Sequence, residues 1–198
     1  MRPKVLVSVT DKRNLGALVP LARNDWEFIS TGGTAKELRT LGVVVTEVSD
    51  YTGFPEMLDG RLKTLHPKIF GGILPDLRVP KHRAEIAEHR IEPITLVVVN
   101  LYDFAKRPNI NEIDIGGPSL LRAAAKNGAT AVPIVDPDDY ERVVSELLST
   151  GVLSLVTRGG LASKVFWATA AYDAMISQWF MEELAAGRNP LNTLPAGH

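Results

Sequence analysis

The chain has 198 residues, of which 45% are hydrophobic and 23% are charged, a balance that fits one soluble domain with a substantial core. Its net charge of −1 excludes the large positive excess that non-specific binding to nucleic acid or to an anionic membrane requires. The absence of cysteine excludes disulfides and thiolate chemistry, and no uncharged apolar run reaches the ~18 residues of a membrane span. We therefore expect a cytoplasmic protein with neither a nucleic-acid nor a membrane partner.

Apolar runs rich in β-branched residues alternate with stretches of helical spacing along the first half of the chain. The predicted strands cover 4–9, 26–30 and 43–48, and the predicted helices cover 14–24 and about 34–41. Pro20 interrupts the leucine pattern of the first helix, because proline lacks the amide hydrogen that a helix interior needs.

The second half continues this alternation. The stretch ITLVVVN (94–100) is apolar on both faces, which predicts a central strand. A further strand is predicted at 130–135, where Pro133 indicates an edge or a strand end. The predicted helices cover 80–90, 118–127, 138–150 and 161–187, and the first of these faces solvent.

The alternation predicts a single α/β domain over 1–185, followed by a tail or linker over 186–198. Its sheet is expected to be doubly wound and mostly parallel, with helices on both faces. In such a sheet, ligands bind at the carboxyl ends of the strands, near the point where the strand order reverses.

The motif STGGT (30–34) joins the second predicted strand to a helix. Gly32 and Gly33 allow the backbone to approach a ligand, and the helix start offers free N–H groups to a phosphate. The hydroxyl groups of Ser30, Thr31 and Thr34 add donors. The alternative is an ordinary β–α turn in which Thr34 only caps the helix.

The motif SVTDK (8–12) ends the first predicted strand and supplies Ser8, Thr10 and Lys12. Lysine is a suitable point charge for a phosphate. The alternative is that Thr10 or Asp11 caps the next helix while Lys12 is solvated. Neighbouring parallel strands would bring this loop and STGGT to one crevice, which favours a shared anion site.

Further polar residues follow the later strands. Asn100 and Tyr102, in NLYDF, offer an amide and a phenol to the crevice, although a half-buried core tyrosine is the common alternative. In IDIGGPSLLRAAAKN (113–127), Arg122 and Lys126 share a helix face, which usually means a solvated surface. The surrounding alanines and leucines allow a second interpretation, in which Lys126 lies partly desolvated against Asp114 and transfers protons.

The stretch GRLKTLHPK (60–68) carries Arg61, Lys63, His66 and Lys68, and taken alone it is typical of a solvated loop. None of the four histidines has metal-ligand spacing with another histidine, so we predict no metal site.

Taken together, SVTDK, STGGT, GRLKTLHPKI, NLY and IDIGGPSLLRAAAKN occur in an order and at a spacing that resembles the IMP cyclohydrolase domain of the bifunctional purine-biosynthesis enzyme. The resemblance covers about residues 3–181. It implies a methylglyoxal synthase-like fold, a homodimer, and a fused or separate AICAR transformylase as partner. It also implies a reaction. The small-molecule substrate is the formylated aminoimidazole carboxamide ribotide (FAICAR), which closes its pyrimidine ring and loses water to give inosine monophosphate (IMP), without a cofactor or a metal.

The resemblance assigns roles to the matching positions. The implied nucleotide and phosphate cradle consists of Ser8, Thr10, Asp11, Lys12, Ser30, Thr31, Gly32, Gly33 and Thr34. The other implied substrate contacts are Arg61, Thr64, Asn100, Ile115, Gly116 and Gly117. The implied catalytic residues are Lys63, Tyr102, Asp114 and Lys126, with Lys126 as the general acid and base. His66 is expected to orient its loop through a hydrogen bond, and Lys68 is expected at the surface.

The chain departs from the family pattern at Phe70 and Gly128, where family members commonly have histidine, and in the short segment 105–112. Two alternative functions share the fold. A methylglyoxal synthase-like lyase leaves KTLHP and RAAAKN without a role. A regulatory nucleotide-binding module needs the phosphate cradle but none of the four catalytic residues.

Overall fold

In the computed structural model, which describes residues 2–193, a single parallel sheet has the strand order β3-β2-β1-β4-β5. The strands are β1 (Lys4–Ser8), β2 (Glu27–Ser30), β3 (Val45–Glu47), β4 (Leu96–Val99) and β5 (Val132–Ile134). All four strand pairings are parallel, which confirms the predicted α/β class. Pro133 lies in an edge strand, as expected. β4 is an interior strand, although the middle position belongs to β1.

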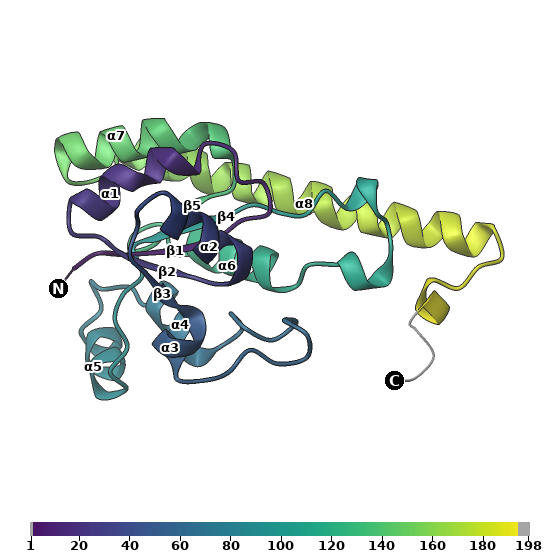
Figure 1. The fold of residues 1–198 in the computed structure, drawn as a ribbon, viewed down its shortest axis with the longest axis horizontal. Helices are drawn as coiled ribbons and strands as arrows, with labels where there is room; N and C mark the ends of the chain where they lie inside the picture. The colour runs from purple at the N-terminus through teal and green to yellow at the C-terminus, as the bar shows by residue number, and fades with distance from the viewer. Residues whose placement is uncertain (1, 194–198) are drawn as a thin grey trace.

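Helices cover both faces of the sheet (Figure 1). One face is covered by η1 (Leu15–Leu18), α1 (Val19–Arg23), α2 (Gly32–Thr40) and α7 (Tyr140–Thr150). The other face is covered by α3 (Val48–Thr52), α4 (Pro67–Ile73) and α6 (Gly116–Lys126). Successive strand residues point to opposite faces, so Val5 and Val7 join the first core and Leu6 joins the second. β4 is buried on both faces, which explains its uninterrupted apolar run.

The predicted helix over 14–24 is divided into η1 and α1, and Pro20 lies in the first turn of α1, where its missing amide hydrogen costs nothing. The helix α5 (Pro80–Glu88) has no buried residue, as predicted for a solvent-facing helix. Neither α3 nor α4 was predicted, because each is short and α4 begins inside the cationic stretch.

The final helix α8 (Leu155–Ala185) begins six residues before the predicted 161–187 helix. Its first half packs against α6 and β5, and its second half extends beyond the sheet (Figure 1). α8 ends at Ala185, and the segment predicted as a tail includes η5 (Pro190–Thr193). Residues 194–198 of that tail lie outside the described residues. The remaining 3-10 helices are η2 (Phe104–Lys106), η3 (Ile110–Glu112) and η4 (Pro137–Asp139).

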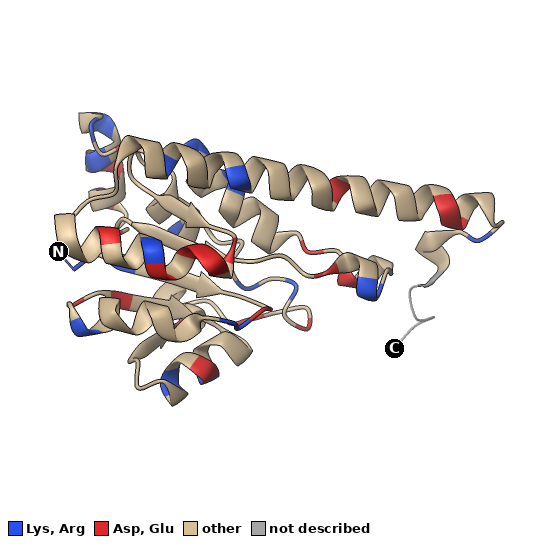
Figure 2. Cartoon of the chain, turned by 90° about the horizontal axis from the view of Figure 1, so that it is seen from above, with Lys and Arg blue, Asp and Glu red and all other residues tan. Residues whose placement is uncertain are grey.

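Basic and acidic residues are interspersed over the body, whereas long stretches of α8 carry neither (Figure 2). Within residues 2–193, no helix combines the length and the apolar character that crossing a membrane requires.

Candidate active site

A cavity of about 680 Å³ opens at the carboxyl ends of β1, β2 and β4. The chain proceeds from β1 to β2 and β3 on one side and then crosses to β4 on the other side of β1. The strand order therefore reverses at β1, which is where ligands bind in open parallel sheets. Most of the predicted site residues line this cavity: Ser8, Thr10, Lys12, Thr31, Gly32, Gly33, Thr34, Arg61, Lys63, Thr64, Asn100, Tyr102, Asp114, Ile115, Gly116 and Gly117.

The phosphate-type loop is built around the start of α2. Thr31 precedes the helix in an extended conformation, and Gly32 follows with φ of +56°, a left-handed geometry that favours glycine. A Cβ on Gly33 would lie 3.2 Å from Nζ of Lys12, so the ammonium group lies over the first turn of the helix. A cation beside unpaired helix amides forms a suitable cradle for an anion.

Two hydroxyl groups of the predicted cradle have structural partners instead. Ser30 is fully buried, and its hydroxyl donates to the carbonyl of Val7 at 2.7 Å, so β2 is tied to β1. Thr34 donates to the carbonyl of Val9 at 2.9 Å and accepts from the Val9 amide at 3.1 Å. Ser30 does not line the cavity, so the structure does not place its hydroxyl towards a substrate. Thr34 lines the cavity but uses its hydroxyl to hold the loop after β1.

Asn100 holds the same loop from the other side. Its Oδ1 accepts from the amides of Thr10 at 2.7 Å and Asp11 at 3.0 Å, and its Nδ2 donates to the carbonyl of Asp11 at 2.7 Å. Only 7% of Asn100 is exposed. The side chain of Asp11 instead pairs with Arg13, and Asp11 does not line the cavity. The carboxylate of Asp11 therefore faces Arg13, and the substrate contact predicted for Asp11 stays a prediction.

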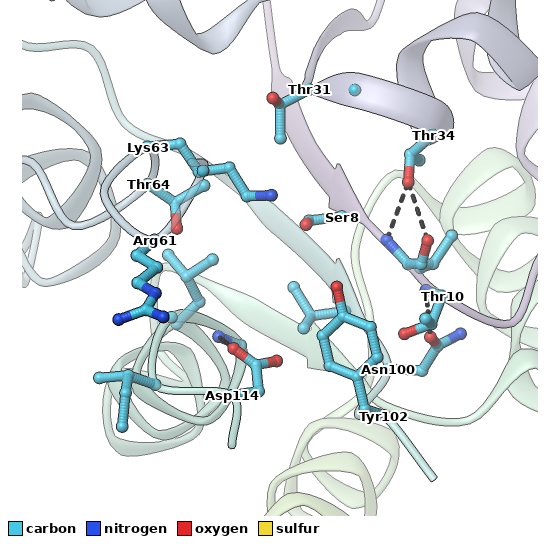
Figure 3. Close-up of a pocket in the computed structure, with 18 of the residues that line it drawn as sticks. Ser8, Thr10, Thr31, Thr34, Arg61, Lys63, Thr64, Asn100, Tyr102 and Asp114 are labelled. Atoms are coloured by element: carbon cyan, nitrogen blue, oxygen red, sulfur yellow. Dashed lines mark hydrogen bonds between the residues drawn. The ribbon is translucent and has the colours of Figure 1, made fainter. Parts of the chain in front are cut away.

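Lys63, Tyr102 and Asp114 come from three different segments of the chain and point into the cavity (Figure 3). Burial raises the pKa of the Asp114 carboxyl, although the Gly117 amide and the positive charge of Lys63 oppose this rise. Burial, followed by the negative charge of Asp114, also raises the pKa of the Tyr102 phenol. Tyr102 is 43% exposed and points into the cavity, so the core-tyrosine alternative is wrong. The site thus holds a neutral phenol, a carboxyl group and a cation around one space.

The start of α6 brings the Asp114 carboxylate into place. The amide of Gly117 donates to Oδ1 of Asp114 at 2.9 Å. A Cβ on Gly116 would lie 3.1 Å from Oγ1 of Thr64, which is buried. These two glycines therefore permit a close approach between the helix start, the carboxylate and the loop that carries Lys63.

That loop contains most of the cationic stretch. Arg61 is exposed, and its guanidinium donates to Oδ1 of Asn111 at 2.8 Å, which connects two loops at the cavity mouth. His66 precedes α4, and its Nδ1 accepts from the Lys68 amide at 3.1 Å, in agreement with the predicted orienting role. Lys68 is half-buried: its ammonium donates to the Tyr51 carbonyl and lies over the Tyr51 ring. The expected surface position of Lys68 is therefore corrected.

Lys126 is the last residue of α6, whereas Asp114 lies two residues before its first. At 1.5 Å per residue the helix separates them by about 15 Å. The Lys126 side chain is exposed and does not line the cavity. The predicted desolvation of Lys126 against Asp114 is wrong, and the cation beside Asp114 is Lys63.

Sequence reasoning missed two residues near the site. Asn111, which holds Arg61, lies in η3, in a segment without apolar periodicity. Tyr172, whose hydroxyl contacts the backbone of Asp114, lies in α8 and is separated from it by 58 residues. No local pattern marks such a contact.

Comparison with known proteins identifies the class. Residues 17–130 match the family model of the MGS-like domain, and residues 124–195 match that of the AICARFT/IMPCHase bienzyme. The chain therefore belongs to the family of MGS-like domains, in agreement with its parallel sheet.

The relatives narrow this class. The bifunctional purine biosynthesis protein PurH of Rhodospirillum rubrum is 50% identical over 194 residues, which cover 91% of this chain and 36% of the relative. PurH of Enterococcus faecalis is 47% identical and is matched over 98% of this chain and 40% of its own length. The chain thus spans about two fifths of these curated relatives. The solved structure of ForH is 36% identical, with a TM-score of 0.82, over 90% of this chain and 97% of ForH.

Proposed function

We propose that the protein is an IMP cyclohydrolase that closes the ring of FAICAR to give IMP. One observation carries this proposal: Lys63, Tyr102 and Asp114 point into the same cavity that Lys12 and the start of α2 line (Figure 3). A nucleotide bound by its phosphate at α2 would extend its base towards the three reactive side chains. The identity to PurH proteins supports the same reaction.

In this reaction the carboxamide nitrogen of FAICAR attacks the formyl carbon of the same molecule. A C–N bond forms, the attacking nitrogen loses a proton, and the formyl oxygen gains it and becomes a hydroxyl group. The C–O bond then breaks: the hydroxyl takes a second proton and leaves as water, while a nitrogen bonded to the same carbon loses its proton and a ring C=N bond forms. Binding the phosphate and the base at two fixed points brings the reacting atoms together, and such positioning supplies a large part of many rate accelerations.

The side chains fit the charges that develop. The ammonium of Lys63 can stabilise the oxygen as it becomes negative. The Tyr102 phenol stays protonated at neutral pH, because its pKa is raised, and can donate to the same oxygen. The ionised form of Asp114 can accept the proton from nitrogen, and its raised pKa makes it a stronger base than an ordinary carboxylate.

We further propose that the protein acts in the cytoplasm as a homodimer, alongside a fused or separate AICAR transformylase. The relatives are bifunctional by name, which supports the transformylase partner. Large apolar side chains on α8 support self-association, since Trp167 is 76% exposed and Met181 is 69% exposed. Light scattering of the purified chain over a concentration series tests the dimer.

The decisive experiment mixes purified protein with FAICAR and follows IMP by absorbance. A regulatory nucleotide-binding module would bind nucleotide tightly without turnover. A methylglyoxal synthase-like lyase would instead release phosphate from a triose phosphate. Turnover of FAICAR supports the cyclohydrolase proposal. Tight nucleotide binding without turnover, or release of phosphate from a triose phosphate, would favour one of the two alternative functions instead.

A further inference from the structure

The helix α8 sends one hydroxyl group to the backbone of the candidate active site. Oη of Tyr172 accepts from the amide of Asp114 at 2.9 Å and donates to the carbonyl of Glu112 at 3.3 Å. Tyr172 is 2% exposed and does not line the cavity. Its hydroxyl therefore contacts the backbone of the Asp114 segment on the side away from the cavity.

The tyrosine ring is held firmly. Phe104, from η2, meets it edge-on with the ring centres 6.2 Å apart, and Trp179 meets Phe104 in the same way at 5.5 Å. These residues form a small core beneath the site, with Ile110 and Ile113 packed against it. A hydroxyl on a ring held this way has a fixed position, so its two hydrogen bonds fix the backbone that they reach.

Asp114 is thus held from two sides. Its backbone amide is bonded to Tyr172, and its carboxylate accepts from the Gly117 amide at 2.9 Å. Residues 113–115 belong to neither η3 nor α6, so no ladder of helical hydrogen bonds fixes this segment. Loss of the tyrosine hydroxyl would leave the amide of Asp114 and the carbonyl of Glu112 without that partner, and the segment would relax towards water.

We propose that Tyr172 is a positioning residue, which holds the backbone of Asp114 so that its carboxylate faces the reacting atoms. This inference rests on the proposed function and extends it by making α8 part of the active-site scaffold. Tyr172 does not touch substrate and takes no proton in the reaction.

The variant Tyr172→Phe tests the proposal, because it removes the hydroxyl and keeps the ring that packs on Phe104. Thr169→Val is the matched control. Thr169 lies on the same helix and is 1% exposed, and among residues 2–193 its hydroxyl bonds to the carbonyls of Val165 and Phe166 within its own helix. Both variants lose one buried hydroxyl, but only the first loses a contact with the Asp114 segment.

In the FAICAR assay we expect Tyr172→Phe to lower kcat by about tenfold to a hundredfold, since small misplacements of catalytic groups have effects of this size. KM should change by no more than about twofold, because the phosphate cradle at α2 is untouched. Thr169→Val should keep the wild-type kcat. A kcat for Tyr172→Phe equal to that of Thr169→Val overturns the proposal.

A second measurement needs no turnover. The hydrogen-bonded amide of Asp114 should exchange slowly in NMR, and Tyr172→Phe should speed its exchange by at least about tenfold while Thr169→Val does not. Unchanged exchange at Asp114 also overturns the proposal. If the wild type fails to convert FAICAR, the proposed function is wrong, and the exchange rates still decide whether Tyr172 anchors Asp114.

Discussion

The carboxylate of Asp114 lies where a side chain on Gly117 would stand. A Cβ on Gly117 would come within 2.2 Å of Oδ2, while the Gly117 amide donates to Oδ1 at 2.9 Å. The close approach is the reason that glycine is required at this position. The backbone conformation is not the reason, because Gly117 does not have a positive φ. The position of the Asp114 carboxylate therefore depends on the absence of a side chain at Gly117 and on the hydrogen bond from the Gly117 amide.

Gly117→Ala should therefore displace Asp114 and lower kcat by about a hundredfold. Gly159→Ala is the matched control, because a Cβ on Gly159, within α8, meets no atom within 4 Å. The measurement is kcat for FAICAR together with the circular dichroism of both variants. A folded Gly117→Ala protein with the kcat of the wild type would show that the position of Asp114 does not matter.

Asp114→Asn should separate activity from stability. Because burial raises the folded-state pKa of Asp114, its contribution to stability is fully present below the unfolded pKa and is lost as the pH rises through the folded pKa. At neutral pH the ionised carboxylate thus opposes folding. We expect Asp114→Asn to have an equal or larger free energy of unfolding than the wild type at about pH 7, and no such gain at about pH 3.

The same variant should have a kcat lowered by about a hundredfold or more, because the amide cannot accept the proton from nitrogen. Urea unfolding at the two pH values and the FAICAR assay provide both readouts. A variant that is less stable than the wild type at neutral pH, or fully active, contradicts this account of Asp114.

Lys12→Met should weaken substrate binding and leave the chemical step intact. Its ammonium lies over the first turn of α2, whereas Tyr102 and Asp114 lie on other segments that line the cavity. We expect KM for FAICAR to rise by about tenfold to a hundredfold with little change in kcat. Lys36→Met, an exposed lysine farther along α2, is the control and should bind normally. Equal KM values for the two variants would remove Lys12 from the phosphate cradle.

Lys126→Ala tests the assignment made by the resemblance. Removal of a residue that acts as general acid and base lowers kcat by about 10²–10⁴-fold. Because Lys126 is exposed at the far end of α6, we expect kcat to stay within about twofold of the wild type. A loss of the larger size would restore the proton-transfer role, and this lysine would then have to reach the cavity of a second copy of the chain.

Much of the fold could be predicted because its signals are local. The apolar run of β4 and the β-branched run of β1 mark strands buried on both faces, whatever lies elsewhere in the chain. The prediction was weaker where tertiary contacts decide the structure. The α4 helix begins in a cationic stretch, and only the burial of Ile69 and Ile73 against the sheet makes it favourable.

The sequence by itself determined the parallel α/β class and the grouping of polar motifs at the strand ends, because a strand pattern or a glycine turn depends on only a few consecutive residues. Tertiary structure alone decided which side chains face a ligand. It joined the Ser30 hydroxyl to β1, left Lys126 in solvent, and brought Tyr172 to Asp114. These outcomes depend on partners tens of residues away, and packing selects such partners without leaving a local pattern.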